Sequence, residues 1–325
     1  MEKKALRIVF MGTPGFAVES LKVLVENQYN VVGVVTMPDK PAGRGYKLQP
    51  SAVKQYALQQ GLKVLQPEKL KEEAFLHALK ILQADIQIVV AFRMLPEVVW
   101  SMPPEGTFNL HASLLPQYRG AAPINWALIN GEKETGVTTF FLSHEIDTGK
   151  IIFREKTPVY EDDNAETLHD RLMVMGAQLV LKTVDAITQG NVTTVSQQNL
   201  VDHSSVLKAA PKIFTETCRV NWYNTTTDIY NFIRGLSPYP TAWTEMYSND
   251  ASEVLRFKLY AGEIVKGGND GLPPGTLVTD NKTHLQVAVK DGFIRLTDIQ
   301  VSGKKRLKTV DFLRGYTFPE HAFFK

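Results

Sequence analysis

Two polar side chains in the first half of the chain have a spacing that suits acyl-transfer chemistry. Asn109 and His111 follow a short apolar stretch and precede the sequence ASLLP. Because residues two apart in a strand project from the same face, we expect the amide and the imidazole to lie side by side. An amide donor and a histidine, which exchanges a proton near neutral pH, can together polarise a carbonyl oxygen. A histidine with a purely structural role is the alternative, and these two residues leave the choice open.

A third candidate is the acidic residue Asp147, which stands in the sequence IDTG after an apolar segment at 140–146. A buried carboxylate near His111 would favour the charged imidazolium and hold the ring in one orientation. An isolated Asp-Thr-Gly sequence more often forms a turn or caps a helix. An aspartic-protease site is disfavoured, because the motif occurs once and the surrounding pattern is of the α/β type.

The glycine- and proline-rich stretch 37–48 carries three basic residues, Lys40, Arg44 and Lys47, with glycines on both sides of Arg44. A loop of this length and charge can close over an anionic partner. The stretch follows an apolar strand. A parallel sheet binds its ligands at the carboxyl ends of its strands, so this position favours a loop with a function over a loop that is only solvated.

The sequence Gly12-Thr-Pro-Gly15 separates the first apolar run from a helical pattern. A helix that begins at such a turn offers free N–H groups to an anion. The spacing is neither GxGxxG nor a GK[ST] phosphate loop, so we expect a tight turn at the ligand edge rather than a dinucleotide site.

The elements that must position these residues alternate between apolar runs and helical patterns in the first half of the chain. Helical patterns at 16–26, 51–60 and 69–82 separate apolar runs at 6–11, 31–36, 64–65 and 86–91. Apolar strands between helices are typical of a parallel sheet that is covered on both faces. We therefore predict a Rossmann-like, doubly wound α/β domain with ligands at the carboxyl ends of its strands.

Beyond residue 211 the apolar runs become short and alternating, which indicates a small β-barrel or sandwich. A helix is expected near 226–235, and strands are expected at 214–221, 242–247, 255–261, 275–279, 285–289 and 292–299. The predicted domains are therefore a catalytic domain at 1–189, a polar linker at 190–207 and a β-barrel domain at 208–325.

Composition narrows the classes further. The 325 residues include a single cysteine, Cys218, which excludes an intramolecular disulfide and a cysteine-based zinc cluster and favours a reduced, cytoplasmic setting. No apolar stretch reaches the length of a membrane helix, and no histidine spacing predicts a metal. The net charge is only +2, but residues 208–325 hold 16 basic against 12 acidic side chains. This surplus is concentrated at Lys304, Lys305, Arg306 and Lys308.

Taken together, these motifs resemble the folate-dependent formyltransferases. The resemblance rests on FMGTPGFA at 10–17, NLHASLLPQYRGAAPINWAL at 109–128 and IDTG at 146–149. The members that formylate methionyl-tRNA are favoured by DKPAGRG at 39–45, IRGLSPYPTAW at 233–243 and GKKRLKTVDFLRG at 303–315. The resemblance extends from the first strand to the last turn.

This resemblance implies a reaction and a role for each catalytic candidate. The α-amine of methionyl-initiator tRNA would attack the formyl group of 10-formyltetrahydrofolate through a tetrahedral oxyanion, without a metal, for translation initiation. Asn109 and protonated His111 would stabilise the oxyanion. Asp147 would keep His111 charged and assist proton transfer.

The resemblance also implies binding residues. The folate would lie along Ser113, Leu114, Leu115 and Pro116, with a pterin pocket at Phe92, Arg93, Met94 and Leu95. Arg93 departs from the family, which often has a glycine there. On an OB-like barrel, the four basic residues of 304–308 would contact tRNA phosphates, while Lys40, Arg44 and Lys47 would approach the acceptor end. We expect a monomer.

Three alternatives remain at this point. A folate-dependent enzyme that formylates an amino sugar nucleotide would share the catalytic half. An NAD-linked oxidoreductase would need a glycine fingerprint and an acid after the second strand, where Thr36-Met37-Pro38 stands. A noncatalytic RNA-binding module would leave Asn109, His111 and Asp147 without a role.

Overall fold

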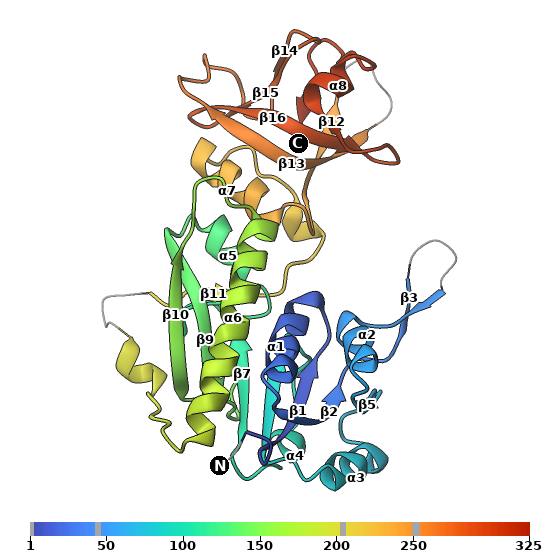
Figure 1. The fold of residues 1–325 in the computed structure, drawn as a ribbon. Helices are drawn as coiled ribbons and strands as arrows, with labels where there is room; N and C mark the ends of the chain where they lie inside the picture. Colours follow the sequence, from blue (N-terminus) through green and yellow to red (C-terminus); the bar gives the residue numbers. More distant parts are fainter. Residues whose placement is uncertain (1–2, 43–46, 202–205, 249–253) are drawn as a thin grey trace. The chain divides into compact units, whose positions relative to one another are not determined.

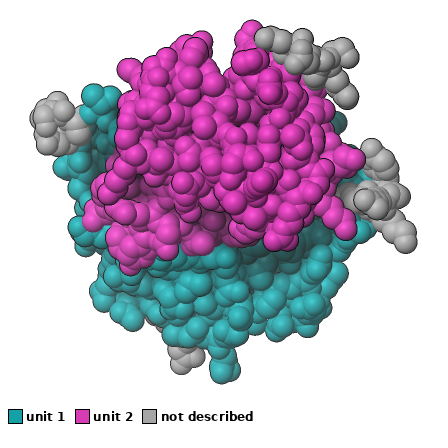
Figure 2. Space-filling view, turned by 90° about the horizontal axis from the view of Figure 1, so that it is seen from above, with its two compact units in different colours: residues 1–120, 135–157, 169–209 teal, residues 121–134, 158–168, 210–325 magenta. Residues whose placement is uncertain are grey.

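The computed structural model describes residues 3–42, 47–201, 206–248 and 254–325. The chain divides into two compact units, which Figure 2 colours separately. Unit 1 comprises Met1–Gly120, Thr135–Thr157 and His169–Ala209. Unit 2 comprises Ala121–Glu134, Pro158–Leu168 and Ala210–Lys325.

Unit 1 is built on a seven-stranded sheet with the order β10-β9-β7-β6-β1-β2-β5 (Figure 1). The strands are β1 (Arg7–Gly12), β2 (Asn30–Val35), β5 (Val64–Leu65), β6 (Ile86–Val90), β7 (Thr107–His111), β9 (Glu134–Phe141) and β10 (Ile151–Pro158). The neighbouring strands β5, β2, β1, β6 and β7 pair in parallel, whereas β9 runs antiparallel to β7. The strand order reverses direction between β1 and β6, which is where a doubly wound sheet opens a crevice. The predicted Rossmann-like fold is confirmed.

The helices of the first half follow the predicted strand–helix alternation. They are α1 (Gly15–Glu26), α2 (Ala52–Gln59) and α3 (Glu73–Ile81), and the chain continues with α4 (Glu97–Trp100) and α6 (Ala165–Thr188). The core on one side of the sheet includes Val9 and Val35 from the strands and Leu79 from α3, all of them almost completely buried. The 24-residue helix α6 was not among the predicted elements. None of the helices in the described ranges is long and apolar enough to span a membrane.

The turn after β1 is tight, as predicted, because β1 and α1 approach each other closely at Gly12. A Cβ atom on Gly12 would lie 2.7 Å from the Cβ of Ala17 and 3.0 Å from the carbonyl oxygen of Val90. Any side chain there would push α1 away from the sheet, so the first glycine of GTPG has a packing role.

The predicted basic loop is a hairpin, in which β3 (Lys40–Ala42) pairs antiparallel with β4 (Lys47–Gln49). Its base is held by Asp39, whose carboxylate accepts hydrogen bonds from Lys54 Nζ at 2.7 Å and Gln66 Nε2 at 2.8 Å. The tip at 43–46, which contains the predicted tRNA contact Arg44, lies outside the described residues.

Unit 2 contains an antiparallel sheet with the order β14-β15-β16-β13-β12-β18, in which β17 also pairs with β16. The strands are β12 (Ala242–Tyr247), β13 (Leu255–Val265), β14 (Leu277–Thr279), β15 (Leu285–Val289), β16 (Gly292–Val301), β17 (Leu307–Lys308) and β18 (Phe323–Phe324). A bridge between Thr276 and Phe323 brings the two edges of the sheet together. The sheet is therefore a nearly closed barrel, which confirms the predicted architecture.

Our prediction of a strand at 214–221 is wrong. The segment contains a short 3-10 helix, Glu216–Cys218, and only Arg219 forms a bridge to a strand residue, Trp243. The hydroxyl of Thr217 bonds to the backbone N–H and carbonyl of Phe214 at 3.0 and 2.8 Å. Such local side-chain bonds satisfy the backbone without a neighbouring strand and favour a turn.

Helix α7 (Thr226–Leu236) packs into the barrel core, with Ile229, Ile233 and Leu236 almost fully buried. A short helix from the middle of the chain, α5 (Pro123–Ile129), belongs to the same unit and lies against α7. The amide of Asn125 donates to the carbonyl of Gly235 at 2.7 Å. A Cβ on Gly235 would lie 2.8 Å from the Ile129 side chain, so a glycine allows the close approach of the helices.

Candidate active site

Strand β7 carries two of the three catalytic candidates at the carboxyl edge of the sheet. Asn109 is paired in register between Val89 of β6 and Phe140 of β9, and His111 lies two residues further along the same face. Asn109 is half-buried, and its side-chain amide makes no hydrogen bond within the described residues. Its donors are therefore available to a ligand at this edge.

The imidazole of His111 is buried and has a defined orientation. Its Nε2 atom lies 2.8 Å from the carbonyl oxygen of Tyr118. A carbonyl oxygen can only accept, so Nε2 carries a proton in every protonation state. Proton exchange is thereby assigned to Nδ1, which lies 3.9 Å from Oδ2 of Asp147.

Asp147 lies on the loop that joins β9 to β10, and its backbone has the left-handed φ of 55°. Asp and Asn are among the few residues that tolerate this conformation. Oδ2 accepts a hydrogen bond from the backbone N–H of Gly120 at 2.9 Å. The structure thus brings His111 and Asp147 together. Over the described part of the chain, no group of three or more His, Cys, Asp or Glu side chains could hold a metal ion.

The glycine of the IDTG sequence has a steric reason. A Cβ atom on Gly149 would clash with the carbonyl oxygen of Phe141 at the end of β9. The turn that carries Asp147 therefore folds back directly onto the strand, and a side chain at position 149 would displace it.

Gln197 is a residue of the site that the sequence prediction missed. Its Nε2 donates to the carbonyl oxygens of Asp147 at 2.8 Å and Gly149 at 2.9 Å. Its Oε1 accepts from Nε and Nη2 of Arg119 at 3.1 and 2.6 Å. Gln197 begins the 3-10 helix Gln197–Leu200, within the segment that we predicted to be a linker. The surrounding polar stretch has no period, so only its unusual burial, with 2% exposure, reveals it.

Three consecutive residues connect these groups. Tyr118 binds His111 through its carbonyl oxygen, and Arg119 binds Gln197 through its guanidinium. Gly120 binds the Asp147 carboxylate through its N–H. The segment Tyr118–Gly120, which includes the short strand β8 (Arg119–Gly120), therefore sets the positions of the histidine and the acid relative to each other.

The two predicted folate segments leave the sheet at the same edge, because the adjacent strands β6 and β7 are parallel. Met94 is 77% exposed, whereas Leu115 is fully buried against Phe140 and Ile151. The hydroxyl of Ser113 is directed inward and donates to the carbonyl of Gln117 at 2.6 Å. The remaining residues of the predicted pocket are Phe92, Arg93, Leu95, Leu114 and Pro116.

Arg93, the departure from the family pattern, ties the loop after β6 to the segment that follows β5. Its Nη1 donates to the carbonyl of Glu68 at 2.6 Å, and its Nη2 donates to the carbonyl of Pro67. Burial lowers the pKa of this guanidinium. Its Nε is buried and has no hydrogen-bond partner among the described residues.

The basic segment of unit 2 divides into two pairs. Arg306 Nε and Lys308 Nζ each lie 2.9 Å from the carboxylate of Asp298, which is only 4% exposed. Burial alone would raise the pKa of Asp298, but the hydrogen bonds from both cations lower it overall. Lys304 and Lys305 are exposed and form no ion pair with the described residues. The positive charges of Lys304 and Lys305 are therefore less compensated by nearby acidic groups than those of Arg306 and Lys308.

Of the three basic hairpin residues that we predicted to contact tRNA, only Lys40 has a described side chain. Lys40 on β3 is exposed. Lys47 begins β4, where its backbone is described but its side chain is not, and Arg44 lies outside the described residues.

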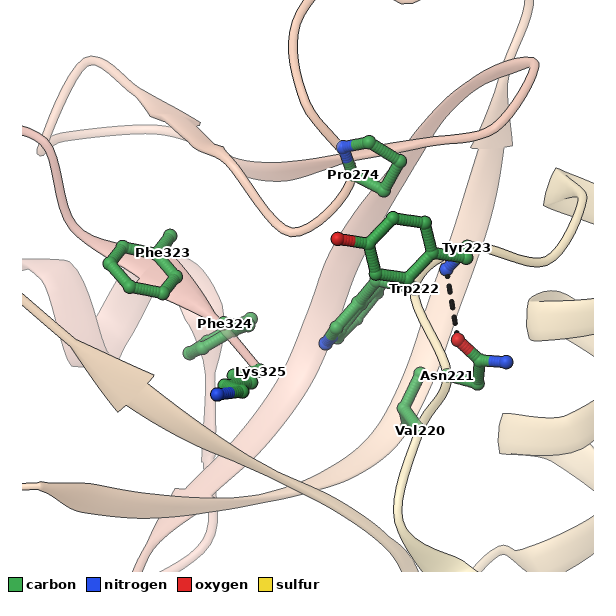
Figure 3. A pocket seen from close by; sticks show the side chains of 8 residues that line it. All are labelled: Val220, Asn221, Trp222, Tyr223, Pro274, Phe323, Phe324 and Lys325. Carbon is green, nitrogen blue, oxygen red and sulfur yellow. Dashed lines mark hydrogen bonds between the residues drawn. The ribbon is translucent and has the colours of Figure 1, made fainter.

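A separate pocket of about 320 Å³ lies in unit 2 and contains none of the predicted site residues (Figure 3). It is lined by Val220, Asn221, Trp222, Tyr223, Pro274, Phe323, Phe324 and Lys325. The indole N–H of Trp222 donates to Thr244 at 3.0 Å, whereas Tyr223 is 71% exposed. Aromatic side chains thus dominate this pocket on the barrel.

Comparison with known proteins gives matches along nearly the whole chain. The family model described as formyl transferase matches residues 6–184, and the model described as formyl transferase, C-terminal domain, matches residues 212–317. The methionyl-tRNA formyltransferase of Phocaeicola vulgatus is 63% identical over 317 residues, which are 97% of each chain. That of Bacteroides thetaiotaomicron is 60% identical over 316 residues, again 97% of each chain.

A solved structure, HypX from Aquifex aeolicus in complex with tetrahydrofolic acid, has a similar fold, with a TM-score of 0.61. The match covers 95% of this chain but only 47% of that longer one. At 17% sequence identity this likeness concerns the fold alone.

Proposed function

Because the chain belongs to the formyl transferase family, we infer that it transfers a formyl group to the amino group of methionyl-tRNA. The observation that carries this inference is the 63% identity to a methionyl-tRNA formyltransferase over 97% of both chains. An enzyme for amino sugar nucleotides is less well supported, because the full-length relatives are named for methionyl-tRNA. The proposed donor is 10-formyltetrahydrofolate, and the proposed acceptor is the initiator form of the tRNA.

The residues at the sheet edge fit such a donor. A formyl oxygen needs a hydrogen-bond donor, and the amide of Asn109 is half-buried with no partner in the described chain. A pterin ring needs apolar contacts and polar groups at its rim. The loop after β6 offers Phe92 and Met94. The buried Nε of Arg93, which has no hydrogen-bond partner in the described part of the chain, is a further donor in the same loop.

In the proposed mechanism, Asn109 and His111 stabilise the negative charge that develops on the formyl oxygen as the amine attacks. One preorganised donor of this kind lowers a barrier by about 2.7–4 kcal/mol. Nε2 of His111 is engaged by Tyr118, so Nδ1 is the nitrogen that can supply a proton. The 3.9 Å separation from Asp147 exceeds a hydrogen bond and leaves the Nδ1 proton accessible to a second acceptor.

The carboxylate of Asp147 faces Nδ1 of His111 at 3.9 Å. The attacking nitrogen must lose a proton, and N10 of the folate must gain one as its bond to the formyl carbon breaks and tetrahydrofolate leaves. We propose that Asp147 assists this proton transfer, directly or through water. Proton transfer by a positioned side chain accelerates a reaction by about 10²–10⁴-fold. The hydrogen bond from Gly120 keeps the carboxylate at the site without neutralising it.

For the tRNA, we propose that residues 1–189 carry the catalysis and that residues 208–325 bind the nucleic acid. Lys304 and Lys305 support this division because they are exposed and unpaired in the described structure. Phosphate contacts by such side chains orient an RNA without reading its sequence. The hairpin residues Lys40, Arg44 and Lys47 would approach the acceptor end. We also propose that the protein is a monomer and acts in the cytoplasm, where initiation takes place.

A formylation assay tests the proposed function directly. The purified protein, supplied with 10-formyltetrahydrofolate, should formylate methionyl-initiator tRNA faster than methionyl-elongator tRNA. An amino sugar nucleotide serves as the competing acceptor. Formylation of the sugar alone would refute the proposal, and equal rates with the two tRNAs would refute the preference for the initiator.

A further inference from the structure

The side chain of Gln197 uses all its hydrogen-bonding capacity between the turn that carries Asp147 and the guanidinium of Arg119. Its two N–H groups reach the carbonyl oxygens of Asp147 and Gly149, and its oxygen receives two bonds from Arg119. The arrangement is unambiguous, because a guanidinium can only donate and a carbonyl can only accept. The orientation of the amide is therefore set by its neighbours on both sides.

The turn needs such support. Asp147 has a left-handed φ of 55°, a conformation that residues with a side chain adopt only rarely. The amide of Gln197 spans the turn, since it binds the carbonyl oxygens on both sides of Thr148. It thereby holds the peptide groups in the geometry that directs the carboxylate toward His111.

The position of Gln197 is itself fixed. Two residues earlier, Val195 exchanges a pair of backbone hydrogen bonds with Ile151 at the start of β10, each 2.9 Å long. Gln197 is 2% exposed, while its neighbour Gln198 is exposed to solvent. The polar segment after α6 therefore inserts one glutamine into the site and leaves the next outside.

We propose that Gln197 is a positioning residue for Asp147 in the formyl transfer. The proposal rests on the function inferred above and deepens it. Gln197 does not contact His111; it acts by holding the 147–149 turn, and Arg119 holds Gln197 in turn. The segment 190–207, which looked like a passive linker, thus contributes a side chain to the geometry of the catalytic acid.

The first test compares two neighbouring glutamines. Gln197→Ala should lower kcat by about 10- to 100-fold, because a small displacement of a catalytic group has effects of this size. KM for each substrate should change less than about twofold, since no substrate contact is removed. Gln198→Ala is the matched control and should retain wild-type kcat. A Gln197→Ala enzyme with wild-type kcat would overturn the proposal.

The second test asks whether Gln197 acts through Asp147. In a double-mutant cycle, Gln197→Ala should cause no further loss of kcat in the Asp147→Asn background, because the positioned charge is already absent. The same fold-loss in both backgrounds would refute the proposal. Gln197→Glu keeps the size of the side chain but places an oxygen against two carbonyls, so it should lose as much kcat as Gln197→Ala.

Folding and function are separated by two further measurements. If Gln197→Ala does not fold, the cycle is run with Gln197→Glu, and failure of both variants to fold would contradict a positioning role. A crystal structure of the folded variant should show the Asp147 carboxylate displaced from His111. An unmoved carboxylate would refute the positioning role alone, whereas a wild-type enzyme that does not formylate methionyl-tRNA would refute the proposed function.

Discussion

The carbonyl oxygen of Tyr118 determines which nitrogen of His111 faces Asp147. It lies 2.8 Å from Nε2 and can only accept, so the variable proton of the imidazole resides on Nδ1, on the side of the carboxylate. This backbone contact orients the ring with no need for a second acidic residue. The pair is thereby preorganised before a substrate arrives.

The charge of Asp147 can be removed while its shape is kept. Asp147→Asn retains an oxygen that can accept from Gly120, so the turn should keep its conformation. Turnover should fall by about 10²–10⁴-fold, the usual contribution of a positioned proton-transfer group. Steady-state formylation should show the loss in kcat rather than in KM. Near-normal turnover would exclude the role that we assign to Asp147.

Asn109→Ala should separate activity from stability. The Asn109 amide has no hydrogen-bond partner within the described chain, so its removal should leave the thermal unfolding temperature almost unchanged. The kcat should fall by about 10²–10³-fold if the amide donates to the developing oxyanion. A variant with altered KM but wild-type kcat would instead assign Asn109 to ground-state binding.

Gly149 should be intolerant of even the smallest side chain. Gly149→Ala would place a methyl group on the carbonyl of Phe141, so we expect strong destabilisation, of about 4 kcal/mol or more, and loss of activity. Gly268→Ala is the control, because nothing lies within 4 Å of a Cβ at that position. Urea unfolding of the two variants should differ clearly. Equal stability would mean that the turn is not packed against β9 as the structure has it.

The proposed tRNA contact of Lys304 can be tested against a lysine at the other end of the same strand. Lys304 follows the 10-residue strand β16 and Lys290 precedes it, so the two lysines lie at opposite ends of this strand. Lys304→Ala should reduce the slope of log kcat/KM against log salt by about 0.7–0.9. Lys290→Ala, with the same loss of charge, should leave the slope unchanged. Equal slopes for both variants would argue against a local contact.

Asp298 should make stability depend on pH in the acid range. Its pKa in the folded protein lies below the ordinary value of 3.8, because the hydrogen bonds of Arg306 and Lys308 outweigh the effect of burial. A lowered pKa stabilises the fold at pH values above about 4, and this contribution is lost as the pH falls below that value. Asp298→Asn should therefore be less stable at pH 7, by about 1.5–3 kcal/mol.

The difference between wild type and Asp298→Asn should narrow as the pH is lowered from 5 toward 2. Asp311→Asn is the matched control: its carboxylate is 49% exposed and pairs with Arg314, three residues further along the chain. Such a surface pair contributes little, so the control should stay within about 0.5 kcal/mol of wild type. Chemical unfolding at several pH values measures both effects. A constant difference for Asp298→Asn at all pH values would contradict the lowered pKa.

Much of the fold could be predicted from periodicity alone. The strands β1 and β6 are buried on both faces, and their continuous apolar runs indicate this directly. Helix α6 had an equally readable start, because Asn164 caps it through bonds to the backbone N–H groups of Glu166 and Thr167. The segment at 214–221 was wrongly predicted as a strand because its buried apolar residues, Cys218 and Val220, lie in or just after a short 3-10 helix rather than in a strand.

The site was predictable where it depended on a strand and unpredictable where it depended on long-range hydrogen bonds. The shared face of Asn109 and His111 follows from the two-residue period of a strand. Nothing in a polar, aperiodic stretch distinguishes Gln197 from Gln198, since only the fold decides which one meets Asp147. The same holds for Asp298, whose partnership compensates two of the four cations that looked equivalent in the sequence.

The packing of α5 against α7 limits where this chain can be joined to a relative in a chimera. Residues 121–134 fall inside the stretch matched by the formyl transferase model, yet they belong to the same compact unit as the barrel. Asn125 and Ile129 meet α7 at Gly235, where a larger residue would not fit. A chimera cut at the polar segment 190–207 would separate these surfaces. Recombination between relatives should therefore conserve the α5 and α7 sequences as a matched pair, even though about a hundred residues separate them.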